Sequence, residues 1–165
     1  MTAPFVLDSN FFIQAHRLHY PMDVVPSFWL KIKELAEKGI IVSLDKVKDE
    51  LHLNKDELTL WCNENLPIDF FRETDVVINE YITVTAWANS KSTHYNIAAL
   101  NEFLDANEAD AWLVAYAIQN GSRIVTHEIS EPNSKKKIKI PDACIPFGIE
   151  CVNTIALFRY LGEQF

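Results

Sequence analysis

Four acidic residues occupy positions from which their carboxylates could act together. Asp8 directly follows the apolar run of residues 5–7, which has the unbroken hydrophobicity of a strand covered on both faces. Glu128 follows a second such run, Asp110 falls in the first turn of an expected helix, and Glu50 lies in a helix after another expected strand. Because ligands of open parallel sheets bind at the carboxyl ends of strands, we expect the four at one edge of a sheet.

Carboxylates gathered at one site repel one another and are costly to desolvate, so such a group is tolerated when a cation neutralises it. Oxygen ligands without an accompanying His/Cys cluster favour magnesium or manganese over zinc. Either ion can lower the pKa of a bound water and stabilise the departing oxyanion of a phosphodiester. The pattern therefore indicates a phosphodiesterase with one or two metal ions.

Each carboxylate also has an ordinary structural explanation. Asp8 could cap the turn that follows it, because Asp favours such positions. Asp110 comes three residues after Asn107 and could be a first-turn acid favoured by the helix dipole. Glu50 comes four residues after Lys46 and could form a surface ion pair with it. The residue types alone leave these alternatives open.

Short apolar strands alternating with helical segments predict the elements that would position these residues. We expect a parallel sheet with helices on both faces, a three-layer α/β/α fold of about four to five strands in a single domain, residues 1–165. The expected strands are residues 5–7, 40–44, 123–126 and 148–152, with a strand or extended link at 67–71. The expected helices are residues 27–38, 45–53 with Asp45 as N-cap, 56–66, 74–89, 107–120 and one beginning at 154.

Composition excludes several other classes of protein. The 165 residues are 48% hydrophobic and 23% charged, as in ordinary globular domains, and no apolar run is long enough to cross a bilayer. No signal peptide is expected, so we predict a cytoplasmic protein without membrane contact. The three cysteines lack close spacing and are expected to be reduced. A net charge of −8 argues against passive binding of nucleic acid through a basic surface.

Four segments resemble the successive motifs of PIN-domain proteins, including the VapC-like toxins, in order and in spacing over nearly the whole chain. They are Phe5-Val6-Leu7-Asp8-Ser9-Asn10, Val47-Lys48-Asp49-Glu50-Leu51, Ala109-Asp110-Ala111-Trp112-Leu113-Val114-Ala115 and Ile124-Val125-Thr126-His127-Glu128. In that family, the matching acidic residues hold divalent metal for cleavage of RNA. The resemblance thus implies a PIN-like fold and a metal-dependent endoribonuclease acting on single-stranded or structured RNA.

The same resemblance assigns roles, a cofactor and partners. It makes Asp8, Glu50, Asp110 and Glu128 the catalytic metal ligands for Mg²⁺ or Mn²⁺, with Asn10 and Thr126 as supporting polar groups. It also implies the toxin of a toxin-antitoxin pair, a cognate antitoxin that blocks the acidic cleft, and, as in many relatives, a homodimer.

The chain departs from the family pattern at two places. The fourth acidic position is usually Asp in a Thr-x-Asp motif, whereas here it is Glu128 preceded by His127, so Glu128 could be only a loop acid. His127 could serve as a general base, but a lone His at a strand end is more often structural. The segment 54–106 is longer than in a minimal toxin.

A lysine-rich loop at residues 131–139 is a candidate RNA contact. Four lysines could bind phosphates there, although such a charge run is more often a solvated loop. Aromatic residues elsewhere could stack bases, but their apolar spacing favours core packing. The four lysines are Lys135, Lys136, Lys137 and Lys139, and the aromatic residues are Phe11, Phe12 and Trp112.

Two other functions compete with the nuclease interpretation. Phosphatases of the haloacid dehalogenase type also begin with an apolar strand that ends in Asp, but they need a second Asp two residues later, where this chain has Asn10. The other alternative is a catalytically inactive PIN-like module for binding or assembly. Loss of acidic ligands would be its signature, and here all four positions are filled.

Overall fold

A five-stranded, entirely parallel sheet forms the centre of the computed structural model, which describes residues 2–165. The spatial order is β3-β2-β1-β4-β5. The strands are β1 (Phe5–Leu7), β2 (Ile41–Leu44), β3 (Phe71–Arg72), β4 (Ile124–Val125) and β5 (Cys151–Val152). The expected parallel sheet is confirmed, and the ambiguous segment 67–71 contributes an edge strand.

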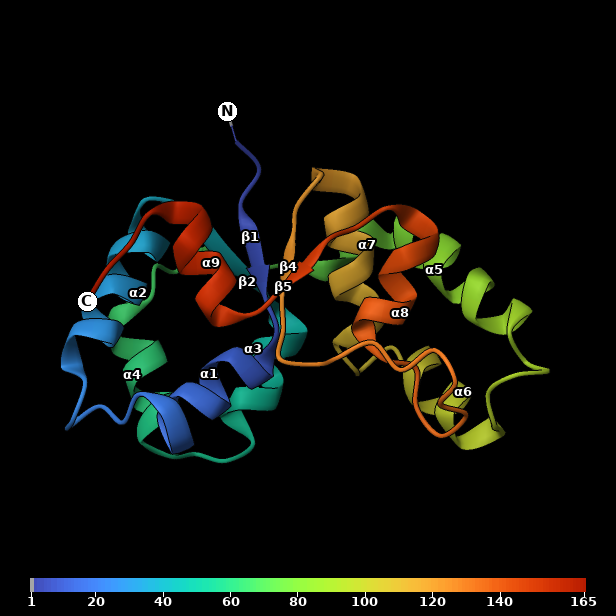
Figure 1. The fold of residues 1–165 in the computed structure, drawn as a ribbon, viewed down its shortest axis with the longest axis horizontal. Helices are drawn as coiled ribbons and strands as arrows, with labels where there is room; N and C mark the ends of the chain where they lie inside the picture. Colours follow the sequence, from blue (N-terminus) through green and yellow to red (C-terminus); the bar gives the residue numbers. More distant parts are fainter. Residues whose placement is uncertain (1) are drawn as a thin grey trace.

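Helices cover both faces of this sheet, which confirms the three-layer α/β/α architecture. In Figure 1, α2 and α9 lie on one side of the strands, whereas α5, α7 and α8 lie on the other. The α-helices within residues 2–165 are α1 (Ser9–Gln14), α2 (Pro26–Glu37), α3 (Asp45–His52), α4 (Glu57–Asn65), α5 (Ile78–Ser90), α6 (Ile97–Leu104), α7 (Asp110–Asn120), α8 (Ile140–Cys144) and α9 (Thr154–Leu161). Shorter turns precede or follow some of them: a π-helix at Ala15–His19 and 3-10 helices at Thr74–Val77 and Ile145–Phe147. No helix of this part of the chain is long and apolar enough to cross a membrane.

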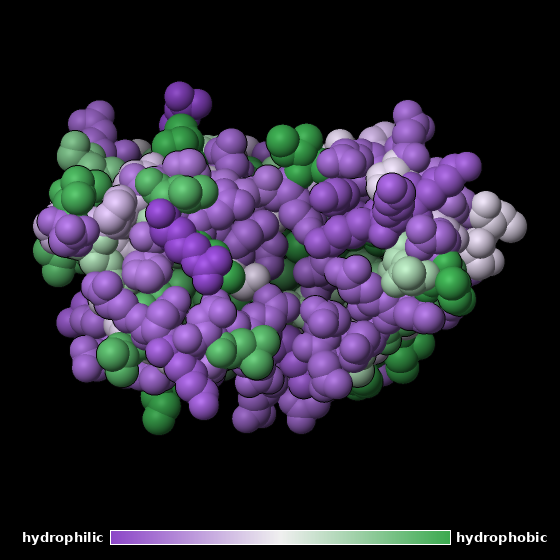
Figure 2. Space-filling model, turned by 90° about the horizontal axis from the view of Figure 1, so that it is seen from below, coloured by the Kyte–Doolittle hydropathy of each residue, from purple (hydrophilic) through white to green (hydrophobic). Residues whose placement is uncertain are grey.

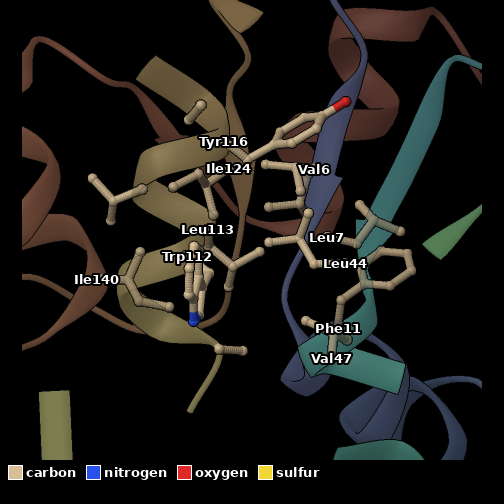
Figure 3. Packing of buried hydrophobic residues seen from close by; sticks show 14 of the residues in the cluster. Val6, Leu7, Phe11, Leu44, Val47, Trp112, Leu113, Tyr116, Ile124 and Ile140 are labelled. Atoms are coloured by element: carbon tan, nitrogen blue, oxygen red, sulfur yellow. The ribbon is translucent and has the colours of Figure 1, made fainter. Parts of the chain in front are cut away.

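The hydrophobic core packs against both faces of β1, which explains why every residue of that strand is hydrophobic. Val6 and Leu7 are fully buried, and α7 packs Leu113 toward them while Phe11 of α1 lies on the opposite side of the strand (Figure 3). Phe12 is also fully buried, and Trp112 is 5% exposed, which confirms that these aromatic residues are core rather than base-stacking platforms.

Helix boundaries follow local signals where those signals are strong. Gly121 takes a left-handed conformation, φ 64°, that side chains disfavour, and it ends α7 where the sequence predicts. The same helix starts later than expected, at Asp110, because the preceding residues form a turn in which Asp105 Oδ1 accepts from the Asn107 amide at 2.9 Å.

Other expectations about the helices are wrong. Asp45 is the first residue of α3 rather than its N-cap, which is Leu44, and Asp45 Oδ2 instead accepts from the amide of Thr74 at 3.3 Å. Helices α1, α6 and α8 were not anticipated, because six-residue, eight-residue and five-residue segments show too few turns for a clear period.

Candidate metal centre

The strand order reverses between β1 and β4, since β2 lies on one side of β1 and β4 on the other. Such a switch point opens a crevice at the carboxyl ends of the two strands. Asp8 follows β1 there, Thr126 follows β4, and the Asp8 amide donates to the Val125 carbonyl at 3.0 Å. In Figure 1 this edge is the lower one, and Figure 2 views it face on as a largely hydrophilic surface that is recessed near its middle.

Asp8 is only 4% exposed, and both of its carboxylate oxygens accept hydrogen bonds. Oδ1 accepts from the Ser9 amide at 2.7 Å and so caps α1, whereas Oδ2 accepts from the Thr126 hydroxyl at 2.9 Å. The capping interpretation is therefore confirmed. Capping involves only one carboxylate oxygen of Asp8. The other oxygen points toward the end of β4.

Thr126 and Asn10 form a network that fixes Asp8. The Thr126 hydroxyl donates to Asp8 and accepts from Asn10 Nδ2 at 3.1 Å and from the Glu128 amide at 3.1 Å. Asn10 Oδ1 accepts from the His127 amide at 3.1 Å. The two residues expected to be supporting polar groups thus join the start of α1 to the end of β4 and hold the Asp8 carboxylate in one orientation.

Asp110 and Glu50 approach the same edge from two helices. Asp110 is the first residue of α7, and Asp8, Glu128 and Glu50 all raise its pKa by charge repulsion, after the larger effect of burial. Glu50 lies in the last turn of α3 and is half-buried, and no ion pair joins it to Lys46 in the part of the chain described. The surface-pair interpretation of Glu50 is therefore not supported.

Glu128 is half-buried beside this group, and each of its carboxylate oxygens already has a partner. Its Oε2 accepts from the amide of Ile140 at 2.7 Å, and its Oε1 lies 3.2 Å from Lys137 Nζ. Its negative charge is nevertheless the second largest cause, after burial, of the raised pKa of Asp8. Glu128 thus belongs to the acidic group but would have to exchange one of these partners to ligate a metal ion.

The carboxylates of the acidic group have too few positive charges near them to balance their own. Burial, then the charge of Glu128, and then that of Glu50, raise the pKa of Asp8 to about 7, although its hydrogen bonds from Thr126 and Ser9 act in the opposite direction. The pKa of Asp110 is raised well above its usual range, and Lys137 alone acts against that increase among its main causes. Burying both carboxylates in ionised form therefore destabilises the fold unless a cation is supplied.

The donor set suits a hard divalent cation, because all four candidates are carboxylates and two have raised pKa values. In the conformation described for residues 2–165, no three Asp, Glu, His or Cys side chains already converge closely enough to hold a metal ion. Binding of a metal ion would therefore require the side chains of Glu50 and Glu128 to rotate. Glu50 lies at the end of a helix and Glu128 lies in a loop.

A family model described as "Domain of unknown function (DUF4411)" matches residues 5–165. The chain belongs to this family. No curated protein and no solved structure matches it. The description of the family assigns no activity.

Two further residues belong to the site although the sequence did not single them out for it. Glu108 is exposed just before α7, and its pKa is raised by partial burial, then by the charge of Glu50. Lys137 reaches the site from the loop and lies 3.2 Å from Glu128 and 4.0 Å from Glu102. The pair Glu108 and Asp110 at the start of the helix could have indicated Glu108, whereas nothing in the sequence pairs Lys137 with Glu128 across the eight loop residues between them.

The four lysines of the loop differ in their surroundings. Lys135 and Lys136 are exposed, whereas Lys137 and Lys139 are half-buried and face carboxylates, with Lys139 Nζ 3.9 Å from Glu131. Phosphate binding by any of them stays a prediction, and only the first two could bind phosphate without leaving an ion pair that the structure contains.

The three cysteines are free, as expected. Cys144 and Cys151 are in contact, with their sulfur atoms 3.4 Å apart. Burial raises the pKa of the Cys62 thiol to about 12, so this side chain is an inert core residue rather than a nucleophile.

Proposed function

We propose that this protein is a divalent-metal-dependent endoribonuclease that cleaves single-stranded or structured RNA. The observation that carries the proposal is the pair of carboxylates formed by buried Asp8 and half-buried Asp110, whose pKa values are raised at the switch point of a parallel sheet. Such a pair is unfavourable for the fold alone and becomes favourable when Mg²⁺ or Mn²⁺ binds. The motif order that resembles PIN-domain nucleases supports the same function.

Asp8 and Asp110 would hold the ion, with Glu50 and Glu128 completing its surroundings. The ion would supply a more acidic bound water and a positive charge for the phosphodiester oxygens. Thr126 and Asn10 keep the Asp8 carboxylate aimed at the site through hydrogen bonds of 2.9 and 3.1 Å. Lys137 forms an ion pair with Glu128 and so places a positive charge beside the acidic group, where it would help to attract a phosphate.

The haloacid dehalogenase alternative gains nothing from the structure. Asn10, which stands where that mechanism needs an acid, donates to Thr126 and accepts from the amide of His127. An Asp at this position would lose the amide donor to Thr126, so the local network is built for Asn.

The test is RNA cleavage by purified protein with Mn²⁺, with Mg²⁺, or with excess chelator. A mixed-sequence single-stranded RNA is the substrate, and the variants are Asp8→Asn and Asp110→Asn, which keep shape and remove charge. Asp49→Asn is the matched control, because Asp49 is exposed on α3 next to Glu50. We expect metal-dependent cleavage by the wild type and the control, and a loss of at least a hundredfold in the two site variants. Equal cleavage by all four proteins would contradict the proposal.

The resemblance extends the proposal to a toxin that is held inactive by a cognate antitoxin, and to a homodimer. Expression of the wild type should then arrest growth of a bacterial host, whereas Asp8→Asn should not. A protein encoded by the neighbouring gene should relieve that arrest and co-purify with the chain. Growth unaffected by a soluble, RNA-cleaving wild type would remove the toxin part of the proposal and leave the nuclease part standing.

A further inference from the structure

A hollow adjoins the acidic group on the same edge of the sheet. Its volume is about 360 Å³, within the range of small-molecule sites. It is lined by His19, Tyr20, His127, Asn153, Thr154 and Ile155. These residues come from the end of the π-helix after α1, from the end of β4, and from the start of α9. No carboxylate lines this hollow, in contrast to the acidic group beside it.

A second cavity, of about 450 Å³, lies between this hollow and Glu128 of the acidic group. That cavity is lined by residues that include Thr126, Glu128 and Cys151, and it shares His127 and Asn153 with the first one. Lining residues therefore succeed one another from Glu128, through His127, to His19. A single-stranded polymer could lie along these residues with successive groups in different surroundings.

Two imidazole rings, those of His19 and His127, line the hollow. The rings of His19 and His127 have centroids 6.1 Å apart and are tilted by 33°. The ring of His127 is fixed, because its Nε2 lies 3.0 Å from the Thr154 hydroxyl and its backbone amide is held by Asn10. His19 is exposed, so its ring can move outward to admit a planar group. Flat aromatic faces at a protein edge are the surfaces on which unstacked bases pack.

We propose that the hollow between His19 and His127 is a base-binding subsite, which takes one unstacked nucleobase of the RNA while the adjoining phosphate lies at the acidic group. The subsite rests on the proposed ribonuclease function. His127 supplies a fixed ring for stacking, and His19 closes over the base from the exposed side. A lining without carboxylates suits a base, whereas the acidic group suits only a phosphate that is accompanied by a cation.

The experiment measures binding separately from cleavage. A short single-stranded RNA with the fluorescent base 2-aminopurine at one position is titrated with protein in Ca²⁺, which can neutralise the acidic group but acidifies a bound water far less than Mg²⁺ or Mn²⁺, so that binding is measured without cleavage. The variants are His19→Ala and His127→Asn. Leu18→Ala is the control, because Leu18 is 69% exposed in the same π-helix and does not line the hollow. Circular dichroism and the melting temperature of each variant verify that it is folded.

We expect wild type and Leu18→Ala to quench the fluorescence of 2-aminopurine, and His19→Ala to bind about five- to tenfold more weakly, as for loss of one base-stacking contact. An oligonucleotide that lacks the base at the labelled position should bind wild type and His19→Ala equally. Unchanged affinity and quenching in both folded histidine variants would overturn the subsite.

The two proposals fail in different ways. If the wild type cleaves RNA but the histidine variants neither bind nor cleave differently, the subsite is wrong and the nuclease stands. If no metal-dependent cleavage occurs while His19→Ala still loses base binding, the subsite stands as a nucleotide-binding site of a protein that is not a nuclease.

Discussion

Replacing Asp8 by Asn removes one buried charge while keeping the size and shape of the side chain. In the metal-free wild type, the pKa of Asp8 is about 7, against a usual value of 3.8. Between these two values the folded state holds a proton that the unfolded state has released, so stability falls as pH rises from about 4 to 7 and is flat above. The carboxylate thus destabilises the metal-free fold at neutral and alkaline pH.

The size of the effect follows from the two pKa values. At 1.36 kcal/mol per unit, full ionisation of Asp8 costs about 4 kcal/mol above pH 7, and about 3 kcal/mol of this develops between pH 5 and pH 8. Asn cannot accept from Thr126 through its amide nitrogen, and losing that hydrogen bond costs about 1 to 2 kcal/mol at every pH. Without metal, Asp8→Asn should therefore match the wild type near pH 5 and exceed its stability by about 2 to 3 kcal/mol at pH 8.

The assay is urea unfolding of wild type and Asp8→Asn in excess chelator at pH 5, 6, 7 and 8, followed by circular dichroism. The difference in free energy of unfolding should grow steadily with pH in favour of the variant. Adding Mn²⁺ at pH 8 should reverse the order, because only the wild type keeps the full set of carboxylates. A difference that is constant with pH, or a variant less stable than wild type at pH 8 without metal, would refute the reasoning.

Three other predictions follow from the same structure. The affinity for Mn²⁺, measured by calorimetry, should rise about tenfold from pH 6 to pH 8 and little above that, since a proton must leave Asp8 before the ion binds; equal affinity at both pH values would contradict this. Lys137→Met should tighten Mn²⁺ binding several-fold by calorimetry while weakening RNA binding, because it removes the positive charge 3.2 Å from Glu128; weaker binding of both ligands would indicate structural damage instead. Leu113→Ala, at a fully buried position in α7, should lower the free energy of unfolding by about 2 to 5 kcal/mol in urea titrations without changing RNA cleavage per folded molecule.

The elements that the sequence predicts well are those whose signals are local and long. The unbroken apolar run of β1 and the Gly121 stop of α7 are local signals that predict the end of each element, and the first of them places Asp8 directly after β1. The parallel order of strands then brings Asp8 and Thr126 to one edge without any further assumption. The sequence alone therefore predicts that Asp8 and Thr126 lie at the same edge of the sheet, although it does not give the distances between their side chains.

The features that sequence analysis missed depend on contacts between distant segments. Helix α8 begins at Ile140, whose amide donates to Glu128, and the amide of Asn96, the N-cap of α6, donates to the carbonyl of Lys135, so the starts of both short helices depend on tertiary contacts. The pairing of Lys137 with Glu128 likewise depends on how the loop folds back. Asp45 has a good capping side chain, but its bond to Thr74, 29 residues away, takes precedence.

The most direct test of the central claim is a crystal soaked in Mn²⁺ and measured at a wavelength where manganese scatters anomalously. The account predicts one strong anomalous peak in contact with the carboxylates of Asp8 and Asp110, and no such peak in crystals of Asp110→Asn. An absence of density there at saturating Mn²⁺, or a peak only at surface carboxylates such as Asp49, would contradict the assignment of a metal centre.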